Sequence, residues 1–412
     1  MKKQASAKKK TSKSAKKSTE KEIYLEGKMD TPAEVAVYYG FKTTTDPIIK
    51  KDDIAKAKGL EESDPRKGAD GPRFPLEERV AIMRTFAEKN WGAENPPVSI
   101  FYRTPLPGEK KSTKAGSKHV SFGLEIMGTT KSIAEALILE TVIAILKEEG
   151  FENLHIEINS LGNSDSATKF SRELTAYYRK HLGDLSAGCR QAFKDGAFEV
   201  LGCNSHDCCL KLTESAPRAV SFLNETDRIH FQEILEFLES TGVSYQINNS
   251  LVGNRNFETG TIFEIREDGN DRSKPPLAYG ARYEGLARKL GARRDIPSVG
   301  ISVSYERKNK SAGTNHRIKK PKVFYIQLGF EAKRKSLGVI ELLRHAKIPV
   351  YQSISRDRLG SQFAAAEKMG VPYIMIMGQK EAVENSVIVR NLANRSQETV
   401  PIADLPKYLR KI

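Results

Sequence analysis

Apolar residues recur along this 412-residue chain with two different periods. Over residues 76–89 they return at the spacing of one side of a helix. The same period predicts helices over residues 132–149, 169–182 and 231–242. Shorter apolar runs predict strands over residues 98–102, 120–127, 155–159, 261–266 and 298–304. A basic loop of residues 110–118 joins the first two strands into a predicted hairpin.

Two segments before the first of these strands differ in pattern. Thr31, Pro32 and Glu34 form a typical helix start, with Thr31 as the predicted N-cap, and this helix is predicted to end near Gly40. Residues 42–74 are polar and rich in Gly, Pro and charged side chains, so they are predicted to be mostly loops.

After residue 320 the pattern changes, because short apolar runs now alternate with helical spacing. The predicted strands and helices cover residues 323–328, 331–346, 350–353, 361–369, 373–377, 386–390 and 402–410. Such alternation predicts right-handed βαβ units and a mostly parallel or mixed sheet. Residues 308–320 are polar and basic, which predicts a linker between two folded domains, residues 30–307 and residues 321–412.

The formal net charge of +15 is unevenly distributed. Residues 1–19 contain eight lysines and no acid, so a disordered tail is predicted over residues 1–29. Such a polycation either binds phosphate backbones without reading sequence or serves as a solubilising tail. No apolar run approaches the roughly 20 residues that span a bilayer, and no apolar segment near the start indicates a secretory signal. We therefore expect a cytoplasmic protein with no membrane contact.

The four cysteines, Cys189, Cys203, Cys208 and Cys209, are clustered in the sequence. This clustering differs from a disulfide framework spread over a fold and suggests a reducing compartment. Together with His206, the thiols offer soft ligands of the kind that zinc prefers. Adjacent cysteines chelate poorly and the spacing is not a paired CxxC, so buried reduced thiols are favoured over a zinc site.

Three motifs follow one another in the second half of the first domain. They are LVGNRNFETGTIFE at residues 251–264, GARYEGL at residues 280–286 and PSVGISVSYER at residues 297–307. The first two resemble the histidine-specific signatures of histidyl-tRNA synthetases, usually LVRGLDYY followed by TGTVFE, and GGRYDGL. The third resembles motif 3 of class II synthetases, which ends in an ATP-binding arginine. Any one match is weak, but three in the family's order and spacing are specific.

Other segments are similar to the same family. Residues 123–128 and 155–162 match its strands, residues 39–41 resemble the remains of motif 1, and residues 321–412 resemble its anticodon-binding domain. The resemblance implies an α+β fold, in which a class II antiparallel-sheet core with an insertion around residues 160–225 precedes a C-terminal α/β domain. Because motif 1 builds the dimer interface in the family, it also implies a homodimer.

For histidine activation the resemblance implies ATP with Mg²⁺, and cations fixed near the α-phosphate. The family supplies one arginine from motif 2 and one from the first signature, where this chain has Gly253. Arg103 takes the position of the motif 2 arginine if the loop after it is longer than the family's. Counting back from Gly123 without a gap instead places Pro107 at that position. Arg307 matches the ATP-binding arginine of motif 3. Arg255 could replace the lost arginine only if its turn is rebuilt. Losing one such donor costs about 10²–10³ in rate.

The resemblance also implies that the amino-acid pocket is partly kept. The segment FPLEER stands where the family has LRPEGT, so Glu77 matches the carboxylate that holds the substrate ammonium. Glu125 matches the carboxylate that reads the imidazole, Tyr283 is retained, and Ser121 replaces a glutamine. Each residue also has an ordinary explanation, since tyrosines are often core residues and charged side chains often form structural ion pairs.

Two functions remain open. With Gly253 and Glu258 in place of the family's arginine and tyrosine, the favoured prediction is a tRNA- or RNA-binding or regulatory pseudoenzyme with weakened or lost histidine activation. A precedent is the synthetase-like regulatory subunit of ATP phosphoribosyltransferase, which usually lacks the anticodon-binding domain that this chain keeps. The alternative is an active histidine–tRNA ligase with a rebuilt site. RNA is expected to bind through residues 321–412 and the lysine-rich tail.

Overall fold

The computed structural model describes residues 29–45, 47–60, 76–93, 97–104, 118–202, 207–267, 275–308, 318–353 and 356–412. Nearly all of the predicted tail, of the basic loop between the first two strands and of the linker lies outside these ranges. What the sequence predicts for those segments therefore stays a prediction.

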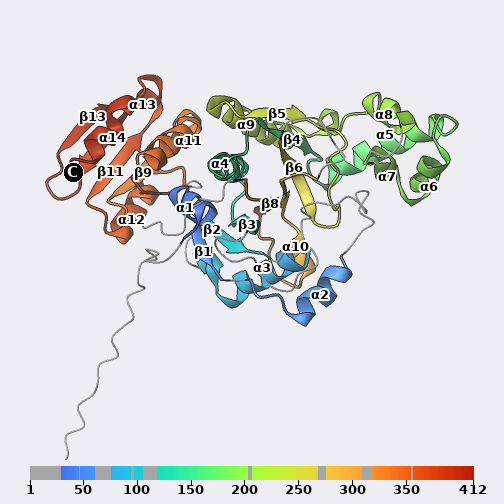
Figure 1. Cartoon of the computed structure of the whole chain (residues 1–412), viewed down its shortest axis with the longest axis horizontal. Helices are drawn as coiled ribbons and strands as arrows, with labels where there is room; N and C mark the ends of the chain where they lie inside the picture. The colour runs from blue at the N-terminus through green and yellow to red at the C-terminus, as the bar shows by residue number, and fades with distance from the viewer. Residues whose placement is uncertain are drawn as a thin grey trace, which may run out of the picture.

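An eight-stranded sheet forms the centre of the larger part of the molecule (Figure 1). Its order is β1-β2-β3-β8-β7-β6-β4-β5. The bounds are β1 Lys42–Thr44, β2 Val98–Arg103, β3 His119–Met127, β4 Leu154–Ser160, β5 Ser244–Ile247, β6 Glu258–Glu267, β7 Ala278–Tyr283 and β8 Ser298–Glu306. The central pairs are antiparallel, and only β1 with β2 and β4 with β5 are parallel. The predicted antiparallel core is confirmed, with a parallel strand added at each edge.

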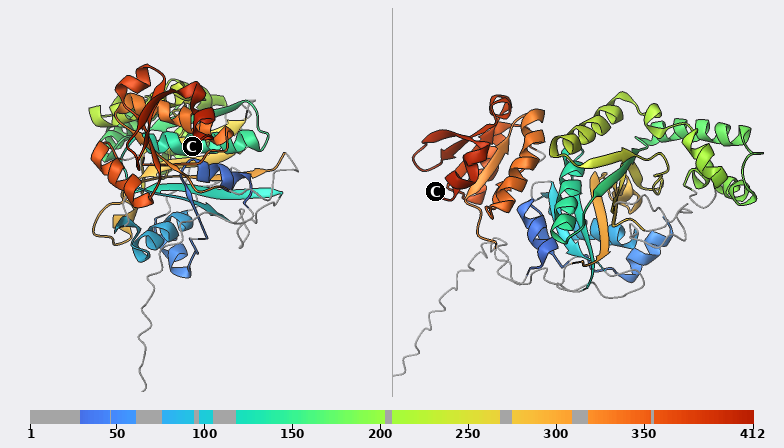
Figure 2. Two further views of the ribbon diagram at one scale, coloured as in Figure 1. Left: turned by 90° about the vertical axis from the view of Figure 1, so that its left-hand side faces the viewer. Right: turned by 45° about the horizontal axis from the view of Figure 1, so that its top comes forward.

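Helices cover both faces of this sheet, as Figures 1 and 2 show. One face carries α1 (Thr31–Tyr38), α4 (Ile133–Glu148) and α9 (Glu225–Thr241), and the other carries α2 (Lys51–Lys58), α3 (Leu76–Glu88) and α10 (Leu286–Lys289). Side chains alternate between the faces along each strand. Phe101 and Leu124 therefore join the core beneath α1 and α4, whereas Ile100 and Tyr102 pack with α3.

The helix predicted from residue 31 is present, but its cap differs. Asp30 is the N-cap, and its carboxylate accepts a hydrogen bond from the Ala33 amide at 3.5 Å, so the assignment of Thr31 as the cap is wrong. The chain turns away at Gly40, whose φ of +93° lies in the left-handed region that glycine tolerates. Seven of the eight α1 residues are buried.

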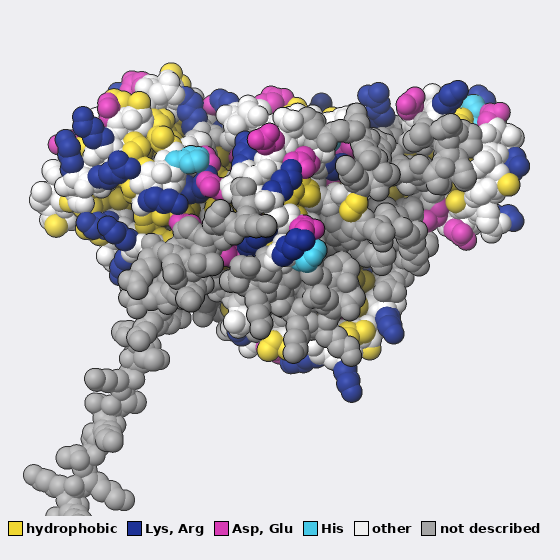
Figure 3. All heavy atoms as spheres, viewed as in Figure 1, with side chains coloured by type: hydrophobic (Ala, Val, Ile, Leu, Met, Phe, Trp, Pro, Cys, Tyr) yellow, Lys and Arg dark blue, Asp and Glu magenta, His cyan; other side chains and the backbone are white. Residues whose placement is uncertain are grey.

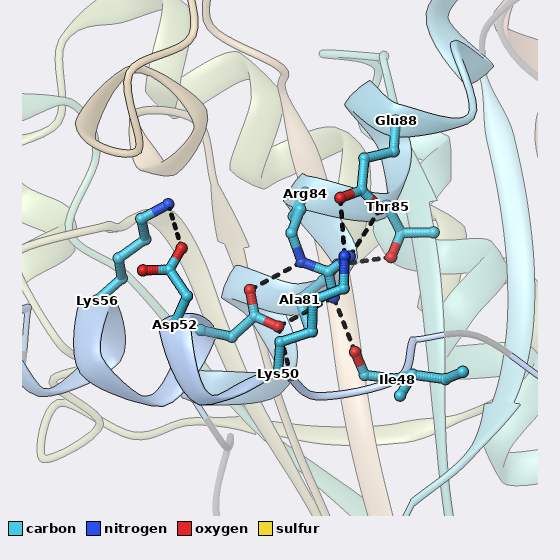
Figure 4. Close-up of polar contacts among 9 residues, drawn as sticks. Ile48, Lys50, Asp52, Lys56, Ala81, Arg84, Thr85 and Glu88 are labelled. Carbon is cyan, nitrogen blue, oxygen red and sulfur yellow. Dashed lines mark hydrogen bonds and ion pairs between the residues drawn. The ribbon is translucent and has the colours of Figure 1, made fainter.

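Helix α2 lies within the residues that were predicted to be loops, and that prediction is wrong for residues 51–58. Its few apolar residues give little helical signal, and charged contacts hold it to α3. Asp53 is fully buried and accepts hydrogen bonds from Arg84 Nε and Nη2, both at 2.9 Å. Glu88 accepts from Arg84 at 2.8 Å and from Lys50 at 3.0 Å (Figure 4). A pattern of apolar residues cannot reveal a helix anchored in this way.

Between β4 and β5 the chain forms a helical insertion at one end of the sheet (Figure 1). It contains α5 (Ser164–Lys180), α6 (Ala187–Asp195), α7 (Ala197–Leu201) and α8 (Asp207–Glu214). Phe170, Leu174 and Phe198 belong to its own apolar core. Only the first of these helices was predicted, because the others are short and follow one another closely.

Cys189 is buried on α6 and is disulfide-bonded. The prediction of reduced thiols is therefore wrong for Cys189, because spacing in sequence does not show which sulfur atoms the fold brings together. The side chains of the other three cysteines are outside the described part. Within that part, no group of three or more His, Cys, Asp and Glu residues is arranged to hold a metal ion.

The C-terminal residues form a separate five-stranded sheet with the order β10-β9-β11-β12-β13. Its elements are β9 Val323–Gln327, α11 Phe330–His345, β10 Val350–Gln352, α12 Leu359–Met369, β11 Tyr373–Met377, α13 Gln379–Val383, β12 Ser386–Asn391, β13 Gln397–Pro401 and α14 Leu405–Leu409. The first two pairs are parallel and the last two antiparallel, so the predicted mixed sheet is confirmed. None of the helices in the described residues is both long and apolar enough to cross a membrane.

Candidate functional site

A buried polar group lies on the α3 side of the large sheet. Glu125 of β3 is wholly buried and stands level with Ile100 of β2 and Gly300 of β8. The Tyr283 hydroxyl donates a hydrogen bond to Glu125 Oε2 at 2.6 Å. A Cβ on Gly300 would lie 2.1 Å from Glu125 Oε1, so only glycine leaves room for this carboxylate. The structure thus brings together Glu125 and Tyr283, which the sequence assigned to one pocket.

Arg79 fills the space beside Glu125. It lies in the first turn of α3, and its side chain is 0% exposed. Its Nη1 contacts Glu125 Oε1 and the Tyr102 hydroxyl, and its Nη2 donates to Ser302 Oγ at 2.7 Å. A guanidinium group from the chain itself therefore lies against side chains of β2, β3 and β8.

The sequence prediction missed the role of Arg79. In the segment FPLEER this residue stands where the family pattern has a threonine, so a small polar side chain is replaced by a long cation. The available signal was its place beside Val80 in the apolar part of α3, where a charged residue needs a buried partner. Glu125 is that partner.

Burial and charge act against each other in this group. Burial lowers the pKa of Arg79 and Glu125 raises it, and the net shift is upward, so the guanidinium stays charged. Burial raises the pKa of Glu125 to about 7, although Arg79 and the hydroxyls of Tyr283 and Tyr102 act to lower it. Burial raises the pKa of both tyrosines well above its usual value. The negative charge of Glu125 therefore depends on Arg79.

The position of the missing signature arginine is filled by another side chain. Glu258 Oε2 accepts hydrogen bonds from the Asn254 amide at 2.7 Å and from the Tyr279 hydroxyl at 2.8 Å. A Cβ on Gly253 would lie only 1.7 Å from that same oxygen. The Glu258 carboxylate therefore occupies the space in which a side chain at residue 253 would begin.

Arg255 lies next to the helical insertion. Its guanidinium carbon is 4.5 Å from the centre of the Phe198 ring on α7, a cation–π contact. Phe198 belongs to the insertion core, separate from the apolar cluster that contains Tyr283. The rebuilt turn that would let Arg255 replace the signature arginine stays a prediction.

Arg103 and Arg307 lie on the opposite face of the sheet from Glu125. Arg103 of β2 is paired with Phe122 of β3. Phe122 is three residues from Glu125 on the same strand, so the two side chains point to opposite faces of the sheet. The side chain of Arg103 therefore points toward α1. Arg103 Nη2 contacts Asp30 Oδ1, and Arg307 Nη2 donates to Asp30 Oδ2 at 2.9 Å. Arg307 Nη1 also contacts Glu149 at the end of α4. Asp30 thus joins the two arginines into one ion-pair cluster.

This cluster does not fit the ATP-binding role that the resemblance implies for Arg103 and Arg307. The guanidinium groups are paired with Asp30 and Glu149, and they do not share a face with Glu125 and Tyr283. A nucleotide on the α3 side of the sheet would therefore not meet these two cations. Their binding to ATP stays a prediction.

Ser121 and Glu77 lie near the central group. Ser121 is on the same face of β3 as Glu125, and its hydroxyl contacts that of Thr104. Glu77 is half-buried in the first turn of α3, two residues before Arg79. The roles in amino-acid binding that the resemblance gives to Glu77, Ser121, Glu125 and Tyr283 stay predictions.

A second buried ion pair supports this region and was not predicted. Arg282, next to Tyr283, donates from Nε and Nη2 to Glu135 of α4, both at 2.5 Å. Glu135 also contacts His230 Nε2 of α9 at 2.8 Å. Burial alone would raise the pKa of Glu135, but Arg282 and His230 lower it to about 2. These contacts hold β7, and with it Tyr283, against α4 and α9 on the other face of the sheet.

Comparison with known proteins gives the following similarities. Residues 322–412 match the family model of the anticodon binding domain. The chain is 26% identical over 379 residues to the histidine–tRNA ligase of Fervidobacterium nodosum, covering 88% of this chain and 89% of the relative. It is 25% identical over 414 residues to that of Staphylococcus saprophyticus, covering 95% and 96%. The solved apo histidyl-tRNA synthetase of S. aureus has a TM-score of 0.48 and 22% identity, covering 91% of this chain and 92% of that one.

Proposed function

Because the chain belongs to the histidyl-tRNA synthetase family, we propose that it binds tRNA or another RNA without activating histidine. One observation carries the second half of this proposal. The Arg79 guanidinium occupies the pocket of Glu125 and Tyr283, which the resemblance assigns to the histidine imidazole. The site has become part of the protein's own interior.

The energetic argument rests on the burial of this ion pair. To reach Glu125, a histidine side chain must displace Arg79, and breaking a buried pair by removing one partner costs about 3–5 kcal/mol. Because each 1.4 kcal/mol is a factor of ten, this cost weakens histidine binding by about 10²–10³-fold or more.

The distribution of cations supports the same conclusion. Attack on the α-phosphate of ATP requires fixed positive charge where negative charge develops. At residue 253 the family's arginine is replaced by glycine, with the Glu258 carboxylate next to it. Arg103 and Arg307 are paired with acids on the other face. No step through ATP follows from these residues.

The distribution of net charge supports RNA binding. Residues 321–412 contain fifteen Lys and Arg against eight Asp and Glu, a net charge of +7. With the eight lysines of the tail, they account for the whole formal charge of +15, so residues 20–320 are neutral. Dark-blue side chains gather on the C-terminal domain in Figure 3. Such surfaces attract phosphate backbones, and this domain matches the anticodon-binding family.

An active histidine–tRNA ligase is the second candidate, and the names of the relatives favour it. This function needs Arg79 to leave the pocket and another cation to meet the α-phosphate, with ATP and Mg²⁺ as the resemblance implies. The lysines of the predicted basic loop, Lys110, Lys111, Lys114 and Lys118, could supply charge in that case; the first three lie outside the described residues. A cytoplasmic location fits both functions and stays a prediction.

Histidine-dependent exchange between ATP and pyrophosphate separates the two functions. We expect the purified full-length chain to give no exchange above background, while the same preparation shifts tRNA in a gel-mobility assay. The tRNA arm shows that the protein is folded and competent to bind. Robust exchange that disappears in Arg103→Ala or Arg255→Ala would establish the ligase and overturn the non-activating proposal.

A further inference from the structure

A cavity of about 400 Å³ lies where the helical insertion meets the last strand of the large sheet. One wall is the end of α8 and the segment that leads from it to η2 (Ala219–Phe222). The other wall is the end of β5 and residues 248–250 after it. The insertion extends from this end of the sheet in Figure 1. A cavity of this size can hold a small molecule.

Two asparagines hold the walls of this cavity in place. Asn249 Nδ2 donates to the Pro217 carbonyl oxygen at 2.9 Å, and its Oδ1 accepts from the Ala219 amide at 3.0 Å. Asn248 Nδ2 donates to Glu157 Oε2 of β4 at 2.6 Å. Asn249 thus ties the insertion to the end of β5, and Asn248 ties the end of β5 to the sheet. These bonds fix both walls without a ligand.

The backbone of Ile247 faces away from the sheet at this cavity. β5 is the last strand of the sheet, and Ile247 is level with Ile158 of β4. The Asn248 amide donates to the Ile158 carbonyl oxygen at 2.9 Å, so Ile158 makes the ladder bonds at this point. The N–H and C=O of Ile247 therefore point away from β4, and among the described residues no further strand pairs with them.

Two charges of opposite sign stand on the other wall. Glu214 ends α8 and Arg218 follows four residues later, and both are exposed. Within the part of the chain that the structure describes, neither side chain forms an ion pair or a hydrogen bond. A cavity that offers a carboxylate and a guanidinium group suits a molecule that carries both charges itself.

Apolar side chains complete the lining. Ile247 is 43% exposed, and Val220 is half-buried. An aliphatic group that covers these side chains removes apolar surface from water, which favours binding. The cavity therefore combines one apolar wall with polar groups of both kinds.

We propose that this cavity binds a free α-amino acid with an aliphatic side chain. Its carboxylate meets Arg218 and the N–H of Ile247. Its ammonium group meets Glu214 and the C=O of Ile247, and its side chain covers Val220. An amino acid carries these two groups on either side of one carbon atom, so it pairs with a strand residue as a neighbouring strand does. The cavity shares no residue with the group around Glu125, so this inference does not depend on whether the chain activates histidine.

Calorimetric titration of the full-length chain with L-leucine is the first test. We expect a dissociation constant on the order of 0.1–1 mM, as for a ligand with so few atoms. Leucinamide lacks the carboxylate charge and 4-methylpentanoate lacks the ammonium group, so each should bind about tenfold more weakly or worse. Absence of leucine binding well above this concentration range, or equal binding of the three compounds, would overturn the proposal.

Variants of the two charged residues show which group of the ligand each one meets. Arg218→Gln should weaken leucine binding about tenfold or more and leave leucinamide binding within about twofold. Glu214→Gln should weaken leucine binding to the same extent and leave 4-methylpentanoate binding within about twofold. If either variant weakens all three compounds equally, its side chain does not meet the assigned group, and the proposed binding mode is wrong.

The matched control is Arg228→Gln on α9, whose side chain is 62% exposed and pairs with Glu225. It removes the same charge from another exposed site and should leave leucine binding within about twofold. Because all three substitutions are at exposed side chains, the variants should fold as the wild type does. Circular dichroism checks this. A control that loses leucine binding as far as Arg218→Gln does would reduce the effect to net charge and overturn the proposal.

Hydrogen exchange measured by NMR locates the ligand. The Ile247 amide faces the cavity and should exchange quickly in the free protein, whereas the Asn248 amide is bonded to Ile158 and serves as the internal control. Saturating leucine should slow exchange at Ile247 about tenfold and leave Asn248 unchanged. Leucine binding without slower exchange at Ile247 would place the ligand elsewhere and overturn the proposal.

Discussion

The guanidinium of Arg79 contacts the carboxylate of Glu125, and both side chains are 0% exposed. Glu125 holds the position that reads the substrate in the family pattern, and Arg79 holds the position of a small hydroxyl residue. The chain thus provides its own cation for the carboxylate to which the resemblance gives a role in ligand binding. The stability of the protein should depend on this buried ion pair.

Arg79→Ala should destabilise the protein by about 3–5 kcal/mol, because it leaves Glu125 buried without its cation. Urea denaturation followed by circular dichroism measures the change. The control is Arg288→Ala, whose salt-bridge partner is Asp295 and whose side chain is 67% exposed, with an expected loss below about 1 kcal/mol. Replacing both partners, as in Arg79→Met with Glu125→Gln, should recover much of the loss. Equal losses in Arg79→Ala and Arg288→Ala would contradict the structural role of the pair.

Gly253→Ala should destabilise the protein by about 1–3 kcal/mol, because a Cβ at residue 253 meets the Glu258 carboxylate at 1.7 Å. The same change made in a Glu258→Ala background should cost much less. A double-mutant cycle in urea measures this coupling. Additive effects would mean that the two residues do not share the space.

Restoring the family's arginine at residue 253 alone should not restore ATP–pyrophosphate exchange.

The architecture could be predicted from the sequence, because the strands of the core alternate cleanly and the motifs are long. The side of the sheet that Arg103 faces could not. A shift of one residue moves a side chain to the other face of a strand, so the alternation along one strand does not show which face Arg103 takes. Only the register of β2 against β3, with Arg103 level with Phe122, decides the question. Asp30, which binds Arg103 and Arg307, is distant from both in sequence, so no local pattern indicates this pairing.

The disulfide at Cys189 should control its reactivity. Under denaturing conditions without a reductant, we expect iodoacetamide to leave Cys189 unmodified, and after reduction to alkylate it fully. Peptide mass spectrometry quantifies both states. A thiol-blocking reagent should be present from cell lysis onward, so that neither oxidation nor exchange can create the bond during isolation. Complete labelling without reductant would support the reduced thiol that the sequence suggested.

Glu140→Gln should make the protein more stable at pH 8 but not at pH 4. Burial, and secondarily Glu341, raise the pKa of Glu140 from its usual 4.5 to about 7, against the lowering effect of Thr241 and Lys147. Because the folded state holds this proton more tightly, stability is full below pH 4.5 and is lost as pH rises through about 7. Glutamine removes that loss, so the gain above pH 7 should be about 1–3 kcal/mol.

Urea denaturation of both proteins at several pH values measures this gain. The control is Glu148→Gln on the same helix, whose carboxylate is 40% exposed and pairs with Arg344. It should give no stabilisation that grows between pH 5 and pH 8. A difference between Glu140→Gln and wild type that does not change with pH would rule out Glu140 as the titrating group.

The lysine-rich tail should strengthen RNA binding without adding sequence preference. Each phosphate that a lysine neutralises adds about 0.7–0.9 to the slope of log K against log salt concentration. Replacing the eight lysines of residues 1–19 by serine should therefore weaken tRNA binding and make the slope shallower by about 2 or more. Replacing them by arginine keeps the charge and should leave the slope unchanged. If the serine variant binds tRNA with the wild-type slope, the tail is a solubilising segment, and RNA binding rests on residues 321–412 alone.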